Sequence, residues 1–328
     1  MTARTYRGTP RNLALLAQAL QAGELVAVPT ETVYGLAADA LDARACRKIF
    51  TAKGRPANDP LIVHIHALRQ LELVARPNSA ALKLAKKFWP GPLTLVLPKT
   101  EAISAVVSAG LPSVAVRMPA HPLFRRLLKL TGVPLAAPSA NRFGYVSPTT
   151  AAHVYEGLGK KIRYILDGGP AQIGLESTIV DLRDPLHPQL LRPGAITRTA
   201  LSRALGRPVG TPASTPARVD TAQLAPGLLA RHYSPRTPVT LHQQLSVRAA
   251  AISSADEAWL FISRPARLRG ENIFWLDAKG ELGGVAHTLF ATLRRLDRSG
   301  YRRIHVELAR GDGLAAAIND RLRRAAAR

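Results

Sequence analysis

The segment Pro29-Thr30-Glu31-Thr32-Val33-Tyr34-Gly35-Leu36 decides how this chain is organised. An apolar run at 25–28 leads into it, and a second run at 33–38 leads out of it. A buried strand that breaks into small polar groups and then resumes is typical of a strand end lining a cleft, where open α/β sheets bind ligands. Taken alone, such a segment would be better explained as a tight strand connection with solvated threonine and glutamate side chains.

Three further segments repeat this pattern of polar or charged groups at the mouth of an apolar run. They are Lys53-Gly54-Arg55-Pro56, Ser113-Val114-Ala115-Val116-Arg117 and Ala137-Pro138-Ser139-Ala140-Asn141. A hydrophobic core does not require lysine, arginine, serine or asparagine at these positions, whereas a site for an anion does. The repetition therefore favours a binding cleft.

Length and charge set broad limits on the function. The 328 residues suffice for one large and one smaller domain, and the hydrophobic content of 47% is enough for a sizeable core. The formal net charge of +23 favours polyanionic partners such as RNA, or anionic substrates such as nucleotides. However, most of the excess is arginine scattered over predicted helices, and an arginine-rich proteome would produce the same bias.

The single cysteine and the lack of long apolar runs indicate the cellular setting. Cys46 alone forms neither an intrachain disulfide nor a CxxC metal site. Residues 1–10 contain no apolar signal core, and no apolar run approaches the roughly 18 residues of a membrane span. We therefore expect a cytoplasmic protein.

Hydrophobic periodicity predicts the elements of the first two thirds of the chain. The expected helices are 11–22, 43–52, 79–88 and 122–130, and the expected strands are 61–65, 93–97, 114–117, 135–137 and 179–182. The helix at 43–52 would deliver Lys53 and Arg55 to a loop. A further helix is expected to begin at 147–150, where Ser147 is a plausible cap.

The composition changes between about 207 and 238, where proline, threonine, serine and alanine dominate. This predicts a linker, yet it contains the unusually specific string Arg231-His232-Tyr233-Ser234-Pro235. The strands expected after it are 239–241, 259–262, 273–276 and 304–306, and the helices are 285–298 and 314–324. We therefore predict an α/β fold with a large twisted mixed-sheet domain at 1–206, a linker at 207–238 and a small parallel-sheet domain at 239–328.

Several familiar catalytic motifs are absent from the sequence. It contains no GxxxxGK[ST], HExxH or GxSxG, and no cysteine-rich metal site. The candidate residues that remain are cations, small hydroxyls and one amide: Lys53, Arg55, Arg117, Arg192, Thr32, Ser139, Ser147, Ser177 and Asn141. Such a set suits the binding of phosphates and carboxylates, with rate enhancement from proximity and charge stabilisation.

Together these segments resemble the YrdC-type threonylcarbamoyl-AMP synthases. The resemblance covers roughly the first two thirds of the chain and rests on 29–36, Lys53-Gly54-Arg55-Pro56, Pro60-Leu61-Ile62-Val63-His64, Trp89-Pro90-Gly91-Pro92-Leu93-Thr94, Val114-Ala115-Val116-Arg117, Pro138-Ser139-Ala140-Asn141, Ser177-Thr178 and Arg192-Pro193-Gly194. The string His232-Tyr233-Ser234-Pro235 and the tail resemble the long form of that family, which adds a small Rossmann-like C-terminal domain.

The resemblance implies a nucleotidyltransferase activity. That family joins L-threonine, bicarbonate and ATP, with Mg2+ accompanying the ATP, to give threonylcarbamoyl-AMP and pyrophosphate. A separate transferase then passes the threonylcarbamoyl group to the adenosine next to the anticodon of certain tRNAs, forming N6-threonylcarbamoyladenosine (t6A). Weak direct contact with tRNA is compatible with this role, and no membrane is involved.

The resemblance also implies roles for individual residues. Lys53 and Arg55 would be catalytic and face the ATP phosphates. Threonine would contact Thr32, His64, Arg117, Ser177 and the backbone of Ala137. The ATP site would comprise Arg55, Asp59, Ser113, Ser139, Asn141, Ser147, Arg192 and, as part of a lid, Tyr233. Asp59 departs from the asparagine often found in that family and is preceded by Asn58. No side chain is assigned as a metal ligand.

Two alternatives remain open at the level of the sequence. One is an RNA-binding module of the same fold, although aromatic residues, which would stack on single strands, make up only 5% of the chain. The other is a carbamoyltransferase-type enzyme with another acceptor, as in hydrogenase maturation, against which the lack of zinc-finger cysteines speaks. The small domain could either position the lid or bind partners.

Overall fold

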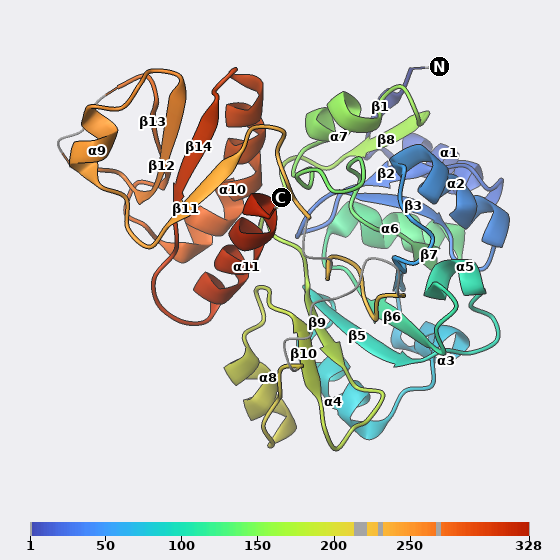
Figure 1. The fold of residues 1–328 in the computed structure, drawn as a ribbon. Helices are drawn as coiled ribbons and strands as arrows, with labels where there is room; N and C mark the ends of the chain where they lie inside the picture. Colours follow the sequence, from blue (N-terminus) through green and yellow to red (C-terminus); the bar gives the residue numbers. More distant parts are fainter. Residues whose placement is uncertain (1, 213–221, 229–231, 267–269, 328) are drawn as a thin grey trace.

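The fold consists of two α/β units, each built around its own sheet (Figure 1). The computed structural model describes residues 2–212, 222–228, 232–266 and 270–327. The first unit contains a ten-stranded sheet and the second a four-stranded sheet. This arrangement confirms the predicted fold class.

The large sheet is mixed, with strand order β1-β8-β2-β3-β7-β4-β6-β5-β9-β10. Its strands are β1 (Arg4–Arg7), β2 (Val26–Val28), β3 (Gly35–Asp39), β4 (Ile62–His64), β5 (Leu93–Pro98), β6 (Ser113–Arg117), β7 (Leu135–Ala136), β8 (Tyr164–Asp167), β9 (Thr178–Asp181) and β10 (Gln189–Arg192). β2 and β3 pair antiparallel across the break at 29–34, whereas β4 and β6 pair parallel. The segment quoted first therefore joins two neighbouring strands of the sheet.

Part of one face of the large sheet, at β4, β5, β6 and β9, is covered by Ala225 and Leu228 of the linker, and most of the remaining surface of the sheet is covered by helices (Figure 1). These helices are α1 (Pro10–Gln21), α2 (Ala43–Lys53), α3 (Leu71–Val74), α4 (Ser79–Phe88), α5 (Ala105–Ser108), α6 (Pro122–Thr131), α7 (Ala151–Leu158) and α8 (Arg198–Leu205), with a short 3-10 turn at Leu68–Gln70. Val26 and Val28 pack with α1 and α6, whereas Ala27 belongs to the core on the other face. This division follows from the alternation of side chains along a strand.

Helix α2 is one residue longer than the sequence predicts. Asp42 caps its first turn by accepting the backbone N–H of Arg44, and Gly54 ends it in the left-handed conformation at φ 63°. Lys53 is therefore the last helical residue and is not part of a loop, whereas Arg55 begins the loop as expected. Helix α7 is capped by Thr150, so Ser147 is not its cap.

The small sheet is parallel, with strand order β11-β14-β12-β13. Its strands are β11 (Val239–His242), β12 (Glu257–Ser263), β13 (Ile273–Asp277) and β14 (Arg303–Glu307), and its helices are α9 (Val247–Ala251), α10 (Leu282–Arg298) and α11 (Leu314–Ala326). Leu260 and Val306 share a core with α10 and α11, whereas Trp259 and Phe261 share one with Ala250 of α9. The sequence did not predict α9.

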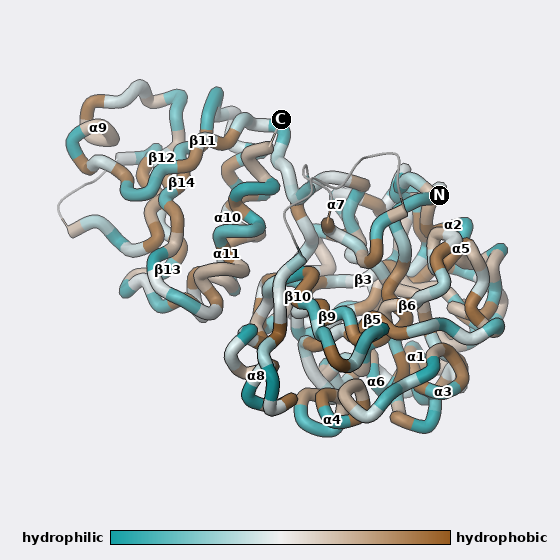
Figure 2. Tube along the Cα trace, turned by 60° about the horizontal axis from the view of Figure 1, so that its bottom comes forward, coloured by the Kyte–Doolittle hydropathy of each residue, from teal (hydrophilic) through white to brown (hydrophobic). Residues whose placement is uncertain are grey.

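Helices α10 and α11 lie on the side of the small unit that faces the large unit (Figure 1). Hydrophobic residues are frequent along the strands of the large sheet, whereas hydrophobic and hydrophilic residues alternate along helices such as α4 and α10 (Figure 2). Leu201 and Leu205 of α8 belong to the main core of the large unit. Within the described residues, no helix is both long enough and apolar enough to cross a membrane.

Candidate active site

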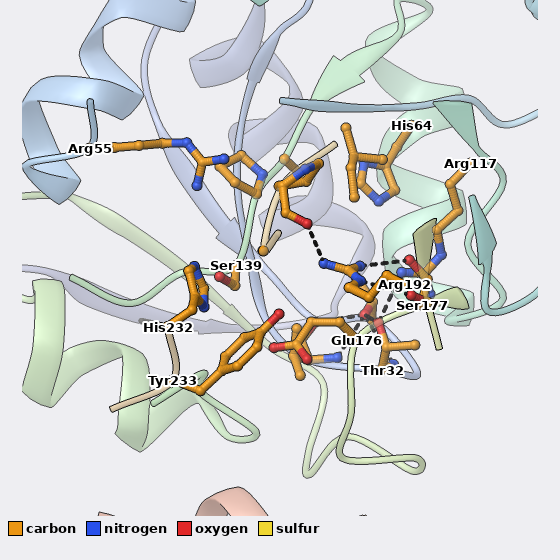
Figure 3. A pocket seen from close by; sticks show the side chains of 18 residues that line it. Thr32, Arg55, His64, Arg117, Ser139, Glu176, Ser177, Arg192, His232 and Tyr233 are labelled. Carbon is orange, nitrogen blue, oxygen red and sulfur yellow. Dashed lines mark hydrogen bonds between the residues drawn. The ribbon is translucent and has the colours of Figure 1, made fainter. Parts of the chain in front are cut away.

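A cavity lies where several strands of the large sheet end (Figure 3). Its walls come from the β2–β3 break, the ends of β4 and β6, the loop after β7, the start of β9, the end of β10 and the linker. The lining residues are Thr30, Thr32, Val33, Gly35, Arg55, Ile62, His64, Arg117, Ala137, Pro138, Ser139, Glu176, Ser177, Arg192, Pro226, Gly227, His232 and Tyr233.

The cavity is lined by every residue that the sequence assigned to threonine: Thr32, His64, Arg117, Ala137 and Ser177. The parallel register of β4 and β6 places His64 directly opposite Arg117. The Arg117 guanidinium donates from Nη1 to Thr32 Oγ1 at 2.9 Å and from Nε to the carbonyl of Gly91 at 3.2 Å. These contacts fix the guanidinium plane at the end of the strand.

Glu31 is a partner of Arg117 that sequence reasoning missed. Its Oε1 lies 2.6 Å from Arg117 Nη2, and its Oε2 accepts the backbone N–H of Ala120 at 3.1 Å. Burial alone would raise the pKa of the Glu31 carboxyl, but the charge and hydrogen bond of Arg117 outweigh it and lower the pKa. Glu31 is therefore a buried anion. The sequence showed a carboxylate in the central segment, but not which cation it meets.

His64 is a neutral imidazole in this environment. Its ring packs against Phe124 with centroids 5.4 Å apart. Burial, together with the nearby Arg117 charge, lowers the pKa of His64 to about 3. Its Nδ1 has no hydrogen-bond partner in the part of the chain that the structure describes. His64 thus offers an uncharged polar group to a ligand.

Lys53 and Arg55, the predicted catalytic pair, are both buried but lie differently. Lys53 does not line the cavity, because its Nζ donates to the carbonyls of Ser139 and Asn141, each at 2.5 Å. Burial, with the neighbouring Arg55 charge, holds the pKa of Lys53 well below its usual value. Lys53 therefore supports the wall of the cavity in this conformation.

Arg55 does line the cavity. It is ion-paired with Asp59 at 2.9 Å, and it donates to the carbonyls of Asp59 and Pro60 at 2.9 and 2.7 Å. Asp59, which was assigned to ATP, lies behind Arg55 and does not line the cavity. Its carboxylate therefore orients Arg55 in this conformation.

The remaining residues assigned to ATP divide into two groups. Ser139, Arg192 and Tyr233 line the cavity, whereas Ser113, Asn141 and Ser147 do not. The Asn141 amide donates to the carbonyls of Arg142 and Tyr145, both at 2.8 Å. Ser147 donates to Glu176 Oε1 at 2.5 Å. Ser113 is buried, and its hydroxyl has no hydrogen-bond partner among the described residues.

Two described parts of the linker lie over the cavity, at 222–228 and from His232 onwards, whereas Arg231 lies outside the described residues. Tyr233 adopts a left-handed backbone at φ 60° and is almost completely buried. The centroid of its ring lies 4.1 Å from the centroid of the His232 ring. A Cβ at Gly227, which itself has φ +79°, would stand 2.5 Å from Tyr233 Oη, so the linker fits closely around this phenol.

Arg192 links the linker to the sheet. Its Nη1 donates to the carbonyl of Pro226 at 2.9 Å, its Nε to the carbonyl of Ser177 at 3.1 Å, and its Nη2 to Ser177 Oγ at 3.2 Å. All three acceptors are uncharged. The positive charge of Arg192 therefore has no counterion among these hydrogen-bond partners.

Sequence reasoning also missed Glu176, the carboxylate of the cavity wall. Its two oxygens are held by Ser147 and by Arg321 of α11, the latter at 2.9 Å. With three arginines and one carboxylate, the lining suits an anionic ligand. The described residues contain no group of three or more histidine, cysteine, aspartate or glutamate side chains that could hold a metal ion.

Two family models match the chain. One, for the Sua5, YciO and YrdC proteins and described as telomere recombination, matches residues 18–194. The other, described as threonylcarbamoyl-AMP synthase, C-terminal domain, matches residues 196–327. Together they extend over both units of the fold.

Proteins similar in sequence are named threonylcarbamoyl-AMP synthase. Threonylcarbamoyl-AMP synthase of Pyrococcus abyssi is 42% identical over 93% of this chain and 91% of that protein, and the Bacillus subtilis enzyme is 38% identical over 96% and 92%. The crystal structure of Pyrococcus abyssi Sua5 complexed with L-threonine matches with a TM-score of 0.90 and 40% identity, covering 99% of this chain and 98% of that one. Escherichia coli YciO, at 20% identity and a TM-score of 0.52, shares the fold over 58% of this chain.

The fold and the cavity define an α/β enzyme with a site for anionic substrates, completed by a linker and a second domain. The extent and identity of these matches make the assignment more specific. The chain belongs to the threonylcarbamoyl-AMP synthase family.

Proposed function

We propose that this protein is a threonylcarbamoyl-AMP synthase, which converts L-threonine, bicarbonate and ATP into threonylcarbamoyl-AMP and pyrophosphate. One observation carries the proposal: a single cavity holds Arg117, which can pair a carboxylate, together with two further cations, Arg55 and Arg192. A reaction that joins an amino acid to a nucleotide requires both sets of groups within reach of one another.

Threonine binds beside Arg117 in this proposal. Nη1 of Arg117 donates to Thr32, whereas Nη2 is ion-paired with Glu31 but has no hydrogen-bond partner among the described residues, so N–H groups remain for the threonine carboxylate. Neutral His64 and Ser177 then face the polar groups of the amino acid. The related Pyrococcus abyssi protein has been crystallised with L-threonine, which supports this assignment.

ATP binds in the same cavity, with Arg55 and Arg192 facing the triphosphate. Ser139 and Tyr233 also line the cavity, and Tyr233 serves as the lid. Lys53 would reach a phosphate only by giving up its bonds to the Ser139 and Asn141 carbonyls. We assign Ser113, Asn141, Ser147 and Asp59 supporting roles behind these ligands.

The reaction follows from these two sets of groups. The uncharged amine of threonine forms N-carboxythreonine by attacking carbon dioxide, with loss of a proton, or bicarbonate, with loss of water. The new carboxylate attacks the α-phosphate of ATP, the bond to the bridging oxygen breaks, and pyrophosphate leaves. Arg55 and Arg192 offset the negative charge that gathers during this step.

Mg2+ enters with ATP as part of the substrate. The ion is usually held through substrate phosphates and water with few protein ligands, which agrees with the predominantly cationic lining of this cavity. When bound, it supplies further positive charge to the phosphates.

The product has a defined destination in this proposal. We place the protein in the cytoplasm, where a separate transferase uses threonylcarbamoyl-AMP to form t6A in tRNA. We assign the chemistry to residues 1–206, the lid to 207–238, and a supporting role to residues 239–328.

Pyrophosphate release tests the proposal. Purified protein with MgATP is expected to release pyrophosphate only when both L-threonine and bicarbonate are present. Release that ignores threonine would indicate an enzyme with another acceptor. No release, together with RNA binding that persists at moderate salt, would favour the RNA-binding alternative.

A further inference from the structure

Arg321 of α11 belongs to the small domain, yet its side chain is completely buried between the two domains. Its Nε donates to Glu176 Oε2 at 2.9 Å, and its Nη1 donates to the carbonyl of Pro193 and to Asp320 Oδ2, each at 2.8 Å. Its Nη2 also lies 3.4 Å from the carbonyl of Glu176. A buried arginine is costly unless its donors are satisfied, so this set of contacts calls for an explanation.

Two partners of Arg321, Glu176 and Pro193, are the sequence neighbours of residues that line the active-site cavity. Glu176 immediately precedes Ser177, and Pro193 immediately follows Arg192. These two segments already touch, because Arg192 donates to the carbonyl and the hydroxyl of Ser177. One guanidinium from the small domain therefore ties together the backbones that carry Ser177 and Arg192.

The two segments also fit closely at Gly194. A Cβ at this position would lie 2.5 Å from the Thr178 nitrogen and 2.9 Å from the Glu176 carbonyl oxygen. Because backbone atoms cannot move aside cheaply, any displacement of one segment is passed to the other. A clamp on both backbones therefore acts directly on the geometry of Ser177 and Arg192.

Arg321 also meets the lid. Its guanidinium carbon lies 5.5 Å from the centroid of the Tyr233 ring, within the range of a cation–π contact. Phe290 of α10 packs on the same ring, with centroids 5.5 Å apart. The Tyr233 hydroxyl has no hydrogen-bond partner among the described residues, and the residue lines the cavity (Figure 3). The small domain thus provides the surface on which the lid rests.

We propose that Arg321 is a positioning residue of the active site: the small domain uses it to hold Ser177, Arg192 and Tyr233 in register for the substrates. This inference rests on the proposed function and extends it by giving the small domain a part in the chemistry. It differs from a purely adhesive role, in which any buried contact between the domains would serve equally.

Arg294 of α10 is a matched control for that adhesive role. It is also buried at the domain contact, donates to the carbonyl of Val146 at 3.0 Å and lies 4.9 Å from the Tyr145 ring. It pairs weakly with Glu156 at 3.9 Å. Like Arg321 it is a buried arginine with a carbonyl acceptor and a ring contact, although its Nε has no hydrogen-bond partner among the described residues, and none of its three partners lines the cavity.

The test compares Arg321→Met, Arg321→Lys and Arg294→Met in the full chain. Pyrophosphate release gives kcat and KM for both substrates, ATP binding is measured directly without threonine, and Tm is recorded with and without ATP. Both methionine variants are expected to lower Tm. Only Arg321→Met should lower kcat/KM, by about 100-fold, because misplacing ligands by an ångström has effects of that order. Arg294→Met should stay within about threefold of wild type.

Arg321→Lys is the second variant, to be used if Arg321→Met does not fold. Lysine retains a charge for Glu176 but lacks the fork that reaches Glu176 and Pro193 together, so we expect a Tm near wild type with kcat/KM still about tenfold lower. Equal losses in Arg321→Met and Arg294→Met, or full activity in Arg321→Lys, would overturn the proposal. If wild type binds ATP but makes no pyrophosphate, the proposed function fails, and unchanged ATP affinity in both Arg321 variants would then refute the positioning role.

Discussion

Two buried arginines, Arg117 and Arg192, line one cavity and are compensated in different ways. Arg117 has an anionic partner, Glu31, at 2.6 Å. Arg192 donates only to the uncharged oxygens of Ser177 and Pro226, and no carboxylate of the described residues forms an ion pair with it. The first is a neutralised pair fixed within the large sheet, and the second is a cation that an anionic ligand can complete.

This difference means that Arg117 contributes mainly to stability, whereas Arg192 contributes mainly to ligand binding. Removing one member of a buried ion pair leaves the other charge uncompensated, which is strongly destabilising. Removing a buried cation without a counterion also removes its desolvation cost, so the folded protein loses little and the ligand loses its partner. The same substitution should therefore have opposite consequences at Arg117 and at Arg192.

The largest effect is expected from Arg117→Met. Glu31 would be left as an unpaired buried carboxylate, and the free energy of unfolding should fall by about 3–5 kcal/mol. Urea denaturation measures this change. The double variant Glu31→Gln with Arg117→Met should recover most of the loss but should not restore threonine binding. A double variant as unstable as the single one would show that the pair is not what stabilises this part of the cavity.

A second effect is expected from Arg192→Met. Its catalytic efficiency for ATP should fall about 100-fold, since one positioned donor to developing charge contributes on this scale. The urea midpoint without ligand should stay the same or rise. Arg183→Met, at an exposed arginine that does not line the cavity, is a control expected to keep a catalytic efficiency near wild type. A large drop in stability for Arg192→Met would mean that its neutral partners compensate it fully.

The smallest effect concerns the neutral His64. Its pKa is about 3 in the folded protein against 6.5 unfolded, so the unfolded chain binds a proton first as the pH falls. Wild type should therefore lose about 1.4 kcal/mol of stability per pH unit below pH 6.5 relative to His64→Gln, or roughly 2 kcal/mol by pH 5. Above pH 6.5 the difference should be constant. Parallel pH profiles for the two proteins would show that His64 titrates normally.

The proposed threonine site could be predicted from the sequence because its residues belong to short segments with strong local signals. Thr32 lies in the β2–β3 break, and His64 and Arg117 end two strands that the apolar runs marked clearly. Parallel pairing of these strands then brings the two side chains together. The partner of Arg117 was not predictable, because nothing in the sequence shows which cation Glu31 meets.

The proposed ATP site was less predictable, because the large domain, the linker and helix α11 of the small domain all contribute to it. Tyr233 stood out within a linker of low complexity, but the close approach of Gly227 and Pro226 could not be read from composition. Arg321 meets Glu176, 145 residues earlier, and in the sequence it resembles its exposed neighbour Arg323 on the same helix. Sequence patterns identify a helix, but the burial of one arginine depends on how the two domains pack.

The most direct test of the central claim is to identify the product made from isotopically labelled bicarbonate, MgATP and L-threonine. The account predicts an adduct of threonine and AMP that carries one labelled carbon, detected by mass spectrometry and formed in equal amount with pyrophosphate. It also predicts that Arg192→Met makes far less of this adduct. Pyrophosphate formed without a labelled adduct would show that the two sets of groups in the cavity do not act on one pair of substrates, and would contradict the account.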